Sequence, residues 1–341
     1  MGTVVAFLAF SLTLERTNIT NKKIQLKKNY VEMKKGRIVL LLAASLMFTG
    51  VASAQTADDV INKFNEAAAL LNAKNYAEAV PVLEQTVELA TASTDEGVAE
   101  TLAETQKQLA NAYLNWGRTL ASGGDMDNAL PKFEKALELA ESYNPANVAV
   151  AKRMIVTVYN IQGGQQVNAG NYAGAAEIYS KALTVDPNNG EIGLLAAQCY
   201  AQAGDLAKAG EIYEKLVAAG NAKAKEAYAI DLLSTAVKAE NFEDANAALQ
   251  KIFSFDPTNA QALLAYIQTA NNYKKYDEVI AKAEEAAAAQ TDEAKKSDIY
   301  FLQAIAYQTK EDKANAIAAY KKVTAGDNAA TAKTQIEALS K

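Results

Sequence analysis

NYAGAAEIYSKALTVDP, residues 171–187, has the features of an amphipathic helix with a defined start and a defined stop. Asn171 is a residue type that favours the N-cap of a helix. Ala175 and Tyr179 lie four residues apart, so a small and a bulky side chain share one helical face. Pro187 ends the pattern because the residue before a proline leaves the α region. The segment therefore predicts a helix that buries one face.

The same pattern recurs along the chain, and most copies start with Asp or Asn. A bulky residue follows the small one by four positions in most copies, and a glycine precedes the start in several. A period near 34 residues predicts a tandem array of helix-turn-helix units. The small residues are Ala79, Ala129, Ala175, Ala209, Ala245, Val279 and Ala316, with spacings of 50, 46, 34, 36, 34 and 37.

The composition also predicts an all-helical protein. Alanine, the best helix former, occupies 70 of the 341 positions, whereas there are only 5 prolines. Half of the residues are apolar and 22% are charged, a balance that is typical of folded chains rather than disordered ones. Large β-sheets are not expected.

The repeated pattern resembles the tetratricopeptide repeat family. The first helices of two units carry the family's small and bulky residues at the expected offsets, as Ala197 with Tyr200 and Ala304 with Tyr307. The resemblance implies a right-handed α-solenoid of about seven repeats over residues 55–326, with a C-terminal capping helix over 327–341.

Two departures from the family pattern have consequences for the fold. The gaps before the second and third repeats are long, and we expect lengthened helices over 95–121 and 146–169 to absorb them. The sixth repeat is weak, because Val279 and Ala283 stand where the family has alanine and an aromatic residue.

Two adjacent glycines interrupt the expected first helix of the third repeat, where each destabilises a helix by about 1 kcal/mol relative to alanine. Gly163 lies at the offset where a small residue allows close helix approach, which leaves Gly164 unexplained. The sequence leaves two explanations of the glycine pair open, close packing against another helix and a local flexure of this helix.

Cys199, the single cysteine, is expected to be buried and inert.

The amino-terminal residues predict an exported protein. Residues 33–54 combine a basic start, an apolar stretch and small residues in A-x-A spacing, which indicates a signal peptide cleaved between Ala54 and Gln55. A membrane anchor is the alternative, but the apolar run is too short to span a bilayer. Residues 1–32 are interpreted as translation from an upstream start, or else as an extended leader. We expect a periplasmic or extracellular location and no membrane span after cleavage.

Composition and charge exclude several classes of function. The chain has no histidine, which removes histidine-based acid–base catalysis, Ser-His-Asp triads and the usual zinc sites. The net charge of the whole chain is −6. Without residues 1–54 the chain has 26 basic and 38 acidic residues, which gives a net charge of −12. A surface of this sign repels nucleic acid and anionic lipid. No cofactor and no metal are expected.

By resemblance to the family, certain offsets of the first helices face a concave groove. Those positions are rich in amides, whose donors and acceptors can pair with the main chain of an extended peptide. The alternative is that they are simply solvated polar residues. The groove positions include Asn160, Asn168, Asp231, Ser234, Gln308 and Thr309, and the candidate peptide-binding residues are Asn115, Arg118, Gln198, Gln202, Lys238, Gln268, Asn271 and Asn272.

These observations favour a non-enzymatic interaction scaffold or adaptor of a bacterial cell envelope, which binds a peptide or a helix of another protein in its groove. The alternative is a structural or assembly element of an envelope complex that self-associates through its repeats. An enzyme is disfavoured because the sequence has no cofactor motif and no convergent set of catalytic residues.

Overall fold

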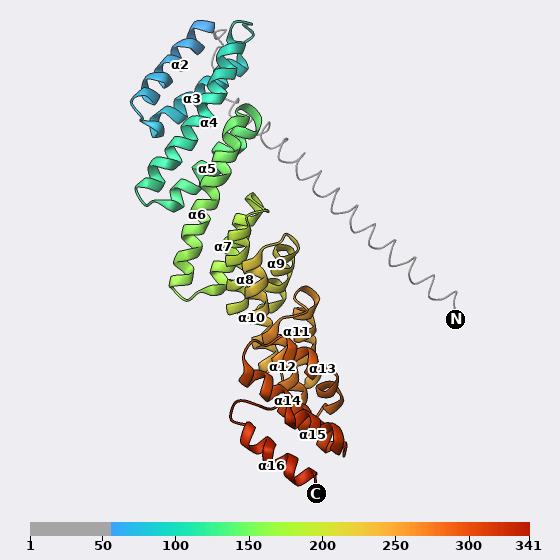
Figure 1. Cartoon of the computed structure of the whole chain (residues 1–341). Coiled ribbons are helices and arrows are strands. Elements are labelled where there is room, and N and C mark those ends of the chain that lie inside the picture. Colours follow the sequence, from blue (N-terminus) through green and yellow to red (C-terminus); the bar gives the residue numbers. More distant parts are fainter. Residues whose placement is uncertain (1–55) are drawn as a thin grey trace, which may run out of the picture. The chain divides into compact units, whose positions relative to one another are not determined.

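The computed structural model describes residues 56–341, and this part of the chain is helical with no β-strand (Figure 1). The all-α prediction is therefore confirmed. The signal peptide and the upstream residues 1–32 lie outside the described residues. The helices are α2 (Ala57–Asn72), α3 (Tyr76–Ala92), α4 (Val98–Ser122), α5 (Met126–Tyr143), η1 (Pro145–Asn147), α6 (Val148–Asn168), α7 (Tyr172–Val185), α8 (Gly190–Gln202), α9 (Leu206–Ala218), α10 (Ala222–Lys238), α11 (Phe242–Phe255), α12 (Ala260–Asn272), α13 (Tyr276–Ala288), α14 (Glu293–Thr309), α15 (Lys313–Lys321) and α16 (Ala329–Leu339).

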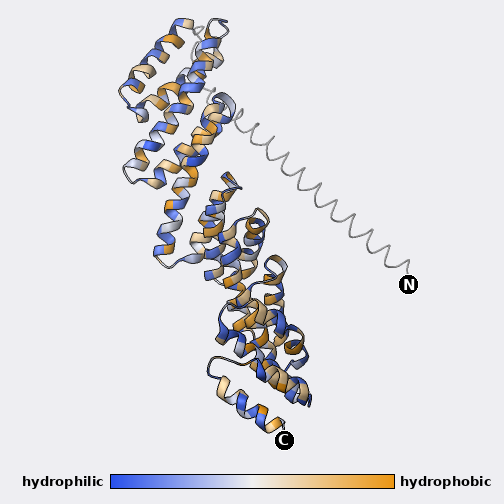
Figure 2. Ribbon diagram, in the orientation of Figure 1, coloured by the Kyte–Doolittle hydropathy of each residue, from blue (hydrophilic) through white to orange (hydrophobic). Residues whose placement is uncertain are grey.

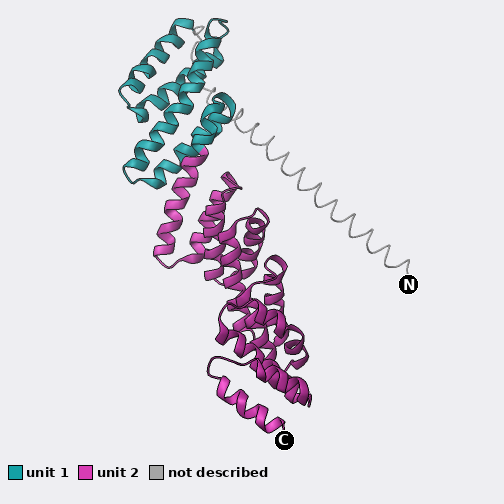
Figure 3. Cartoon of the chain, viewed as in Figure 1, with its two compact units in different colours: residues 1–151 teal, residues 152–341 magenta. Residues whose placement is uncertain are grey.

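The chain divides into two compact units, residues 1–151 and residues 152–341 (Figure 3). The described part of the first unit holds α2 to α5 and η1, and the second unit holds α7 to α16. Helix α6 begins in the first unit and continues into the second. The domain bounds predicted from the sequence, a repeat array over residues 55–326 and a capping helix over 327–341, stay a prediction.

The two lengthened helices that the sequence predicted are present. Helix α4 has 25 residues and α6 has 21, against 13 residues in α8 and in α12. The Asp-Pro pairs also act as predicted, because α7 ends at Val185 and α11 at Phe255, directly before them. The helices carry both polar and apolar residues (Figure 2), as expected of helices that bury one face.

The turns within the helix pairs explain the glycines that precede the repeated pattern. Gly124, Gly170 and Gly204 have φ angles of +85°, +73° and +86° at the turns before α5, α7 and α9. This left-handed conformation is easy only for glycine. At the residue after such a turn, Asn171 accepts a hydrogen bond through its side chain from the backbone N–H of Gly174, as an N-cap does.

The small and bulky residues of the pattern form the core. The seven small residues are between 0 and 2% exposed, and the bulky residues that follow them in α3, α5, α7, α9, α11 and α15 are equally buried. Each small side chain lets a neighbouring helix approach closely. The repeated small and bulky residues therefore describe how the core is packed, and not what lies on the surface. The bulky residues are Leu83, Phe133, Tyr179, Tyr213, Leu249 and Tyr320.

The structure distinguishes the two adjacent glycines of α6. A Cβ atom on Gly163 would lie 2.6 Å from the nearest ring carbon of Tyr179 in α7, whereas one on Gly164 would meet nothing within 4 Å. A Cβ on Gly117 of α4 would likewise lie 2.7 Å from the ring of Phe133 in α5. Packing thus accounts for Gly163, and no contact requires a glycine at position 164.

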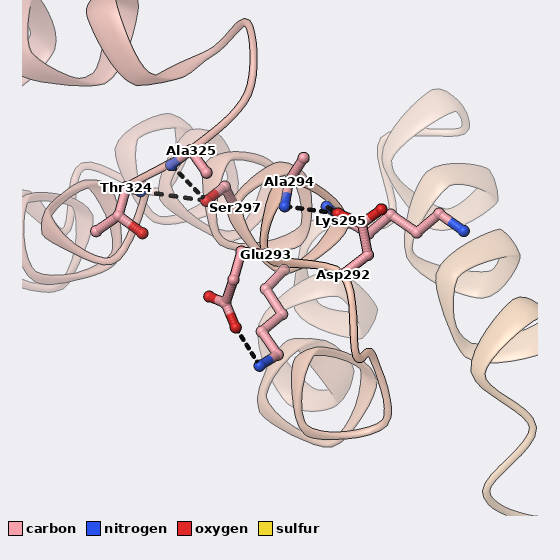
Figure 4. A network of polar contacts seen from close by, with 8 residues as sticks. Asp292, Glu293, Ala294, Lys295, Ser297, Thr324 and Ala325 are labelled. Carbon is pink, nitrogen blue, oxygen red and sulfur yellow. Dashed lines mark hydrogen bonds and ion pairs between the residues drawn. The ribbon is translucent and has the colours of Figure 1, made fainter.

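The C-terminal helix is attached through apolar contacts and a buried hydroxyl. Ala332 and Ile336 of α16 pack in a cluster with Ala304 and Tyr320. Ser297 of α14 is 1% exposed, and its Oγ accepts hydrogen bonds from the backbone N–H groups of residues 324 and 325 at 3.2 and 3.0 Å (Figure 4). One side chain therefore satisfies two donors of the linker that leads to α16.

The contrast between the glycines predicts opposite effects of the same substitution. Gly163→Ala should destabilise the fold by about 1 to 3 kcal/mol, because the new methyl group collides with a buried ring. Gly164→Ala should stabilise it by about 0.5 to 1 kcal/mol, because it removes a flexible residue from a helix at no steric cost. Urea denaturation of the two variants measures both effects. Equal stability of the two variants would contradict the assigned contact.

The buried hydroxyl predicts a local effect on the C-terminal helix. Ser297→Ala leaves two backbone donors without a partner and should destabilise by about 1 to 3 kcal/mol. It should also speed proteolysis within the linker, residues 322–328. The matched control is Ser254→Ala, because that exposed hydroxyl bonds only within its own helix, to the carbonyl of Lys251. The control should stay within about 0.5 kcal/mol of the parent.

Candidate interaction site

A hollow of about 1090 Å³ lies beside α10 in the second unit, and we call it the α10 pocket. Its walls come from the end of α8, the start of α9, one face of α10, the turn after α10 and the first part of α11. The residues that matter for its chemistry are Gln202, Leu206, Asp231, Ser234, Lys238 and Asp244.

The sequence of α10 explains why one of its faces lines the pocket. Tyr228, Asp231, Thr235 and Lys238 follow one another at spacings of three and four residues and therefore share a face. Ala229 and Ala236, on another face, are buried in the core with α11 and α12. The amphipathic pattern thus sets which side chains face the pocket.

An aromatic stack lies behind this face. The rings of Tyr213 and Tyr228 are 5.0 Å apart between centroids and inclined by 18°, and Tyr228 and Phe255 are 5.4 Å apart and inclined by 11°. Tyr213 is fully buried. Stacked rings of this kind give rigid support, because their large contact area fixes the helices that carry them.

The stack holds a carboxylate in place. The hydroxyl of Tyr213 donates a hydrogen bond of 2.9 Å to Oδ2 of Asp231. Burial raises the pKa of Asp231, and the bond from Tyr213 opposes this only in part. Burial also raises the pKa of Tyr213, which keeps that hydroxyl protonated as a donor. The result is a partly buried carboxylate in a fixed orientation.

A second hollow of about 720 Å³, the α12 pocket, lies between α12, α14 and the linker before α16. Three of its residues, Gln268, Asn271 and Asn272, are amides from α12. On the opposite side, Asn328 of the linker donates a hydrogen bond of 3.0 Å to Oδ1 of Asp298. This pocket therefore offers polar side chains from two directions.

The candidate residues from the sequence are distributed over several places. Gln202 and Lys238 line the α10 pocket, and Gln268, Asn271 and Asn272 line the α12 pocket. Gln198 is half-buried on α8 and lines neither. In the first unit, Nη1 of Arg118 donates a 3.1 Å hydrogen bond to Oδ1 of Asn115. The candidate residues of the second unit therefore line one of two hollows or neither, and their role in binding stays a prediction.

Sequence reasoning missed the pocket residues that do not lie on first helices. Leu206 begins α9, Asp244 lies in the first turn of α11, and Asp327 belongs to the linker before α16. The family offsets that guided the prediction describe first helices only. No signal in the sequence placed these three side chains beside the groove.

Two further features bear on the chemistry of the described residues. No group of three or more histidine, cysteine, aspartate or glutamate residues within 56–341 is arranged to hold a metal ion. Cys199 is buried, and burial raises the pKa of its thiol.

Within residues 56–341, no helix combines the length and the apolar character that crossing a membrane requires.

Family models of the tetratricopeptide repeat match this chain in three places. One model covers residues 167–230, and a second covers residues 110–143 and 297–325. Among curated proteins, the chain is 28% identical over 127 residues to Protein FLUORESCENT IN BLUE LIGHT, chloroplastic, of Arabidopsis thaliana. That match covers 35% of this chain and 38% of the length of the plant protein.

Solved structures that are similar to parts of this chain include three with low TM-scores. A crystal structure of MamA is 25% identical, with 49% of this chain and 89% of that chain covered and a TM-score of 0.34. A tetratricopeptide repeat protein from Parabacteroides merdae is 14% identical, with 83% and 99% covered and a TM-score of 0.27. The P58(IPK) TPR domain is 15% identical, with 83% and 97% covered and a TM-score of 0.29.

The three matched segments coincide with helix pairs that the structure shows. Residues 110–143 span the second half of α4 and all of α5, residues 167–230 include α7 to α9, and residues 297–325 include most of α14 and all of α15. In each segment a small residue on the second helix is buried at the predicted position. The chain therefore contains tetratricopeptide repeats in these three segments, and such repeats support a protein-interaction scaffold.

Proposed function

We propose that this chain is a non-enzymatic scaffold of a bacterial cell envelope, and that it holds a segment of another protein in the α10 pocket. The observation that carries the proposal is the pocket itself, an open hollow of about 1090 Å³ with polar and apolar walls. Its volume lies slightly above the range that ligand pockets usually have, roughly 300 to 1,000 Å³.

The walls of the α10 pocket suit a polypeptide better than a small apolar ligand. Gln202, Ser234 and Thr235 offer hydrogen-bond donors and acceptors that can pair with a peptide main chain. Leu206 and Leu232 add apolar surface for side chains. A segment laid along α10 would meet both kinds of surface in turn.

The reactive groups of the chain support a binding role. Histidine is absent from the whole sequence, so no imidazole can act as a general base. The single thiol, Cys199, is buried with a raised pKa, which is the opposite of what activates a cysteine nucleophile.

The envelope location is supported by residues 33–54, whose sequence has the three regions of a signal peptide. We expect the protein recovered from an envelope fraction to begin at Gln55. Amino-terminal sequencing of that protein measures this directly. An intact Met33 or Met1 on the folded protein would overturn the export part of the proposal and leave the binding part unaffected.

A site-specific photo-cross-linker tests the binding part. Placed at Ser234, an exposed residue of the pocket wall, it should capture one protein partner from envelope extract. Placed at Glu211, an exposed residue of α9 that does not line the pocket, it should not capture that partner. Capture of the same protein with equal yield from both positions would contradict the assigned surface.

Self-association is the second candidate, and exposed apolar residues of α10 favour it. Val237 is 77% exposed and Ile230 is 55% exposed, and both lie on the same face because they are seven residues apart. A second copy of the chain could cover them. If the cross-linker at Ser234 joins two copies of this chain, and the mass in solution rises with concentration, the assembly role replaces the scaffold role.

A further inference from the structure

We propose that the α10 pocket recognises a cationic side chain, lysine or arginine, of the bound segment, and that the carboxylate of Asp231 is its anchor. This inference rests on the proposed function, because it names the chemistry of the partner at the same site.

Asp231 has one oxygen in use and one available. Its Oδ2 accepts the hydrogen bond from Tyr213, while none of the described residues donates a hydrogen bond to Oδ1. No lysine or arginine of the described part of the chain forms an ion pair with this carboxylate. The side chain is also partly exposed in the pocket wall, so a ligand can reach it.

The negative charge of Asp231, as distinct from its hydrogen bond with Tyr213, does not stabilise the fold. Because burial raises the pKa of Asp231, the folded chain binds that proton more tightly than the unfolded chain does. Ionisation of Asp231 at neutral pH therefore disfavours the folded state. An asparagine could accept the same hydrogen bond from Tyr213 without this penalty. The charged Asp231 carboxylate thus lies in a pocket wall although its charge lowers the stability of the folded chain. A binding role predicts such a group.

The other charges of the pocket favour a cation near Asp231. Glu240 and Asp244 are acidic, against Lys238 and Lys251. Lys251 is neutralised, since its Nζ lies 2.7 Å from Oε1 of Glu214. Lys238 lies two helical turns from Asp231, roughly 10 Å along the axis, at the end of α10 where the two other acidic residues are. The pocket thus has an acidic surplus, and Asp231 is its most buried member.

The surroundings of Asp231 suit lysine or arginine rather than a free cation. Leu206 and Leu232 line the same pocket and can cover the aliphatic stem of such a side chain. A long side chain with an apolar stem and a charged tip uses all of these groups.

The test selects heptapeptides from a random library on the immobilised purified chain. We expect lysine or arginine to be enriched at least tenfold at one position of the bound peptides. Asp231→Asn should abolish this enrichment, while its melting temperature equals or exceeds that of the parent. The matched control is Glu211→Gln, which makes the same change of charge outside the pocket and should keep the enrichment.

A second variant guards against an indirect effect of changing Asp231. Ser234→Lys places a cation one turn away on the exposed pocket wall and leaves the Tyr213 bond intact, so it should also abolish the enrichment. Bound peptides without a basic preference, or a basic preference that persists in Asp231→Asn, would overturn the inference and leave the proposed function standing. A chain that binds no peptide would overturn both.

Discussion

The close approach of paired helices is the constraint on which the rest of this structure depends. In two pairs a glycine lies opposite a bulky residue, Gly163 against Tyr179 and Gly117 against Phe133. Interiors of proteins are packed as densely as organic crystals, so a single added methyl group at such a point has no room. The distance between helices, and with it the position of every side chain on their outer faces, follows from these contacts.

The aromatic residues connect this packing to the candidate site. The ring of Tyr213 is buried in the core, and its hydroxyl donates a hydrogen bond to the carboxylate of Asp231. Tyr266 of α12 makes a comparable bond of 2.6 Å to Glu278 of α13. Buried tyrosines usually place their hydroxyl against a partner, because an unpaired polar atom in the interior destabilises the fold. In the α10 pocket, that general solution leaves a carboxylate in the pocket wall.

The two pockets of the second unit differ in chemistry. The α10 pocket combines carboxylates, hydroxyls and apolar side chains, whereas the α12 pocket is lined by amides and by the linker before α16. The linker before α16 is held by Ser297 and contributes residues to this pocket, while α16 itself packs on the last helix pair. Packing constrains which residues can occupy the core. It does not constrain the residues that line the pockets, so these residues can differ from one repeat to the next.

The sequence by itself determined the helices and their core. The spacing of Ala175 and Tyr179, the capping Asn171 and the Asp-Pro stops are local signals that act within one or two helical turns, and the structure agrees with them. The grouping of side chains into pockets depended on tertiary structure. Gln202 lines the same pocket as Asp244, and Asn272 the same pocket as Asp327, only because segments distant in sequence are brought together, which no local periodicity encodes. The burial that raises the pKa of Asp231 has the same origin, since the residues that shield it come from neighbouring helices.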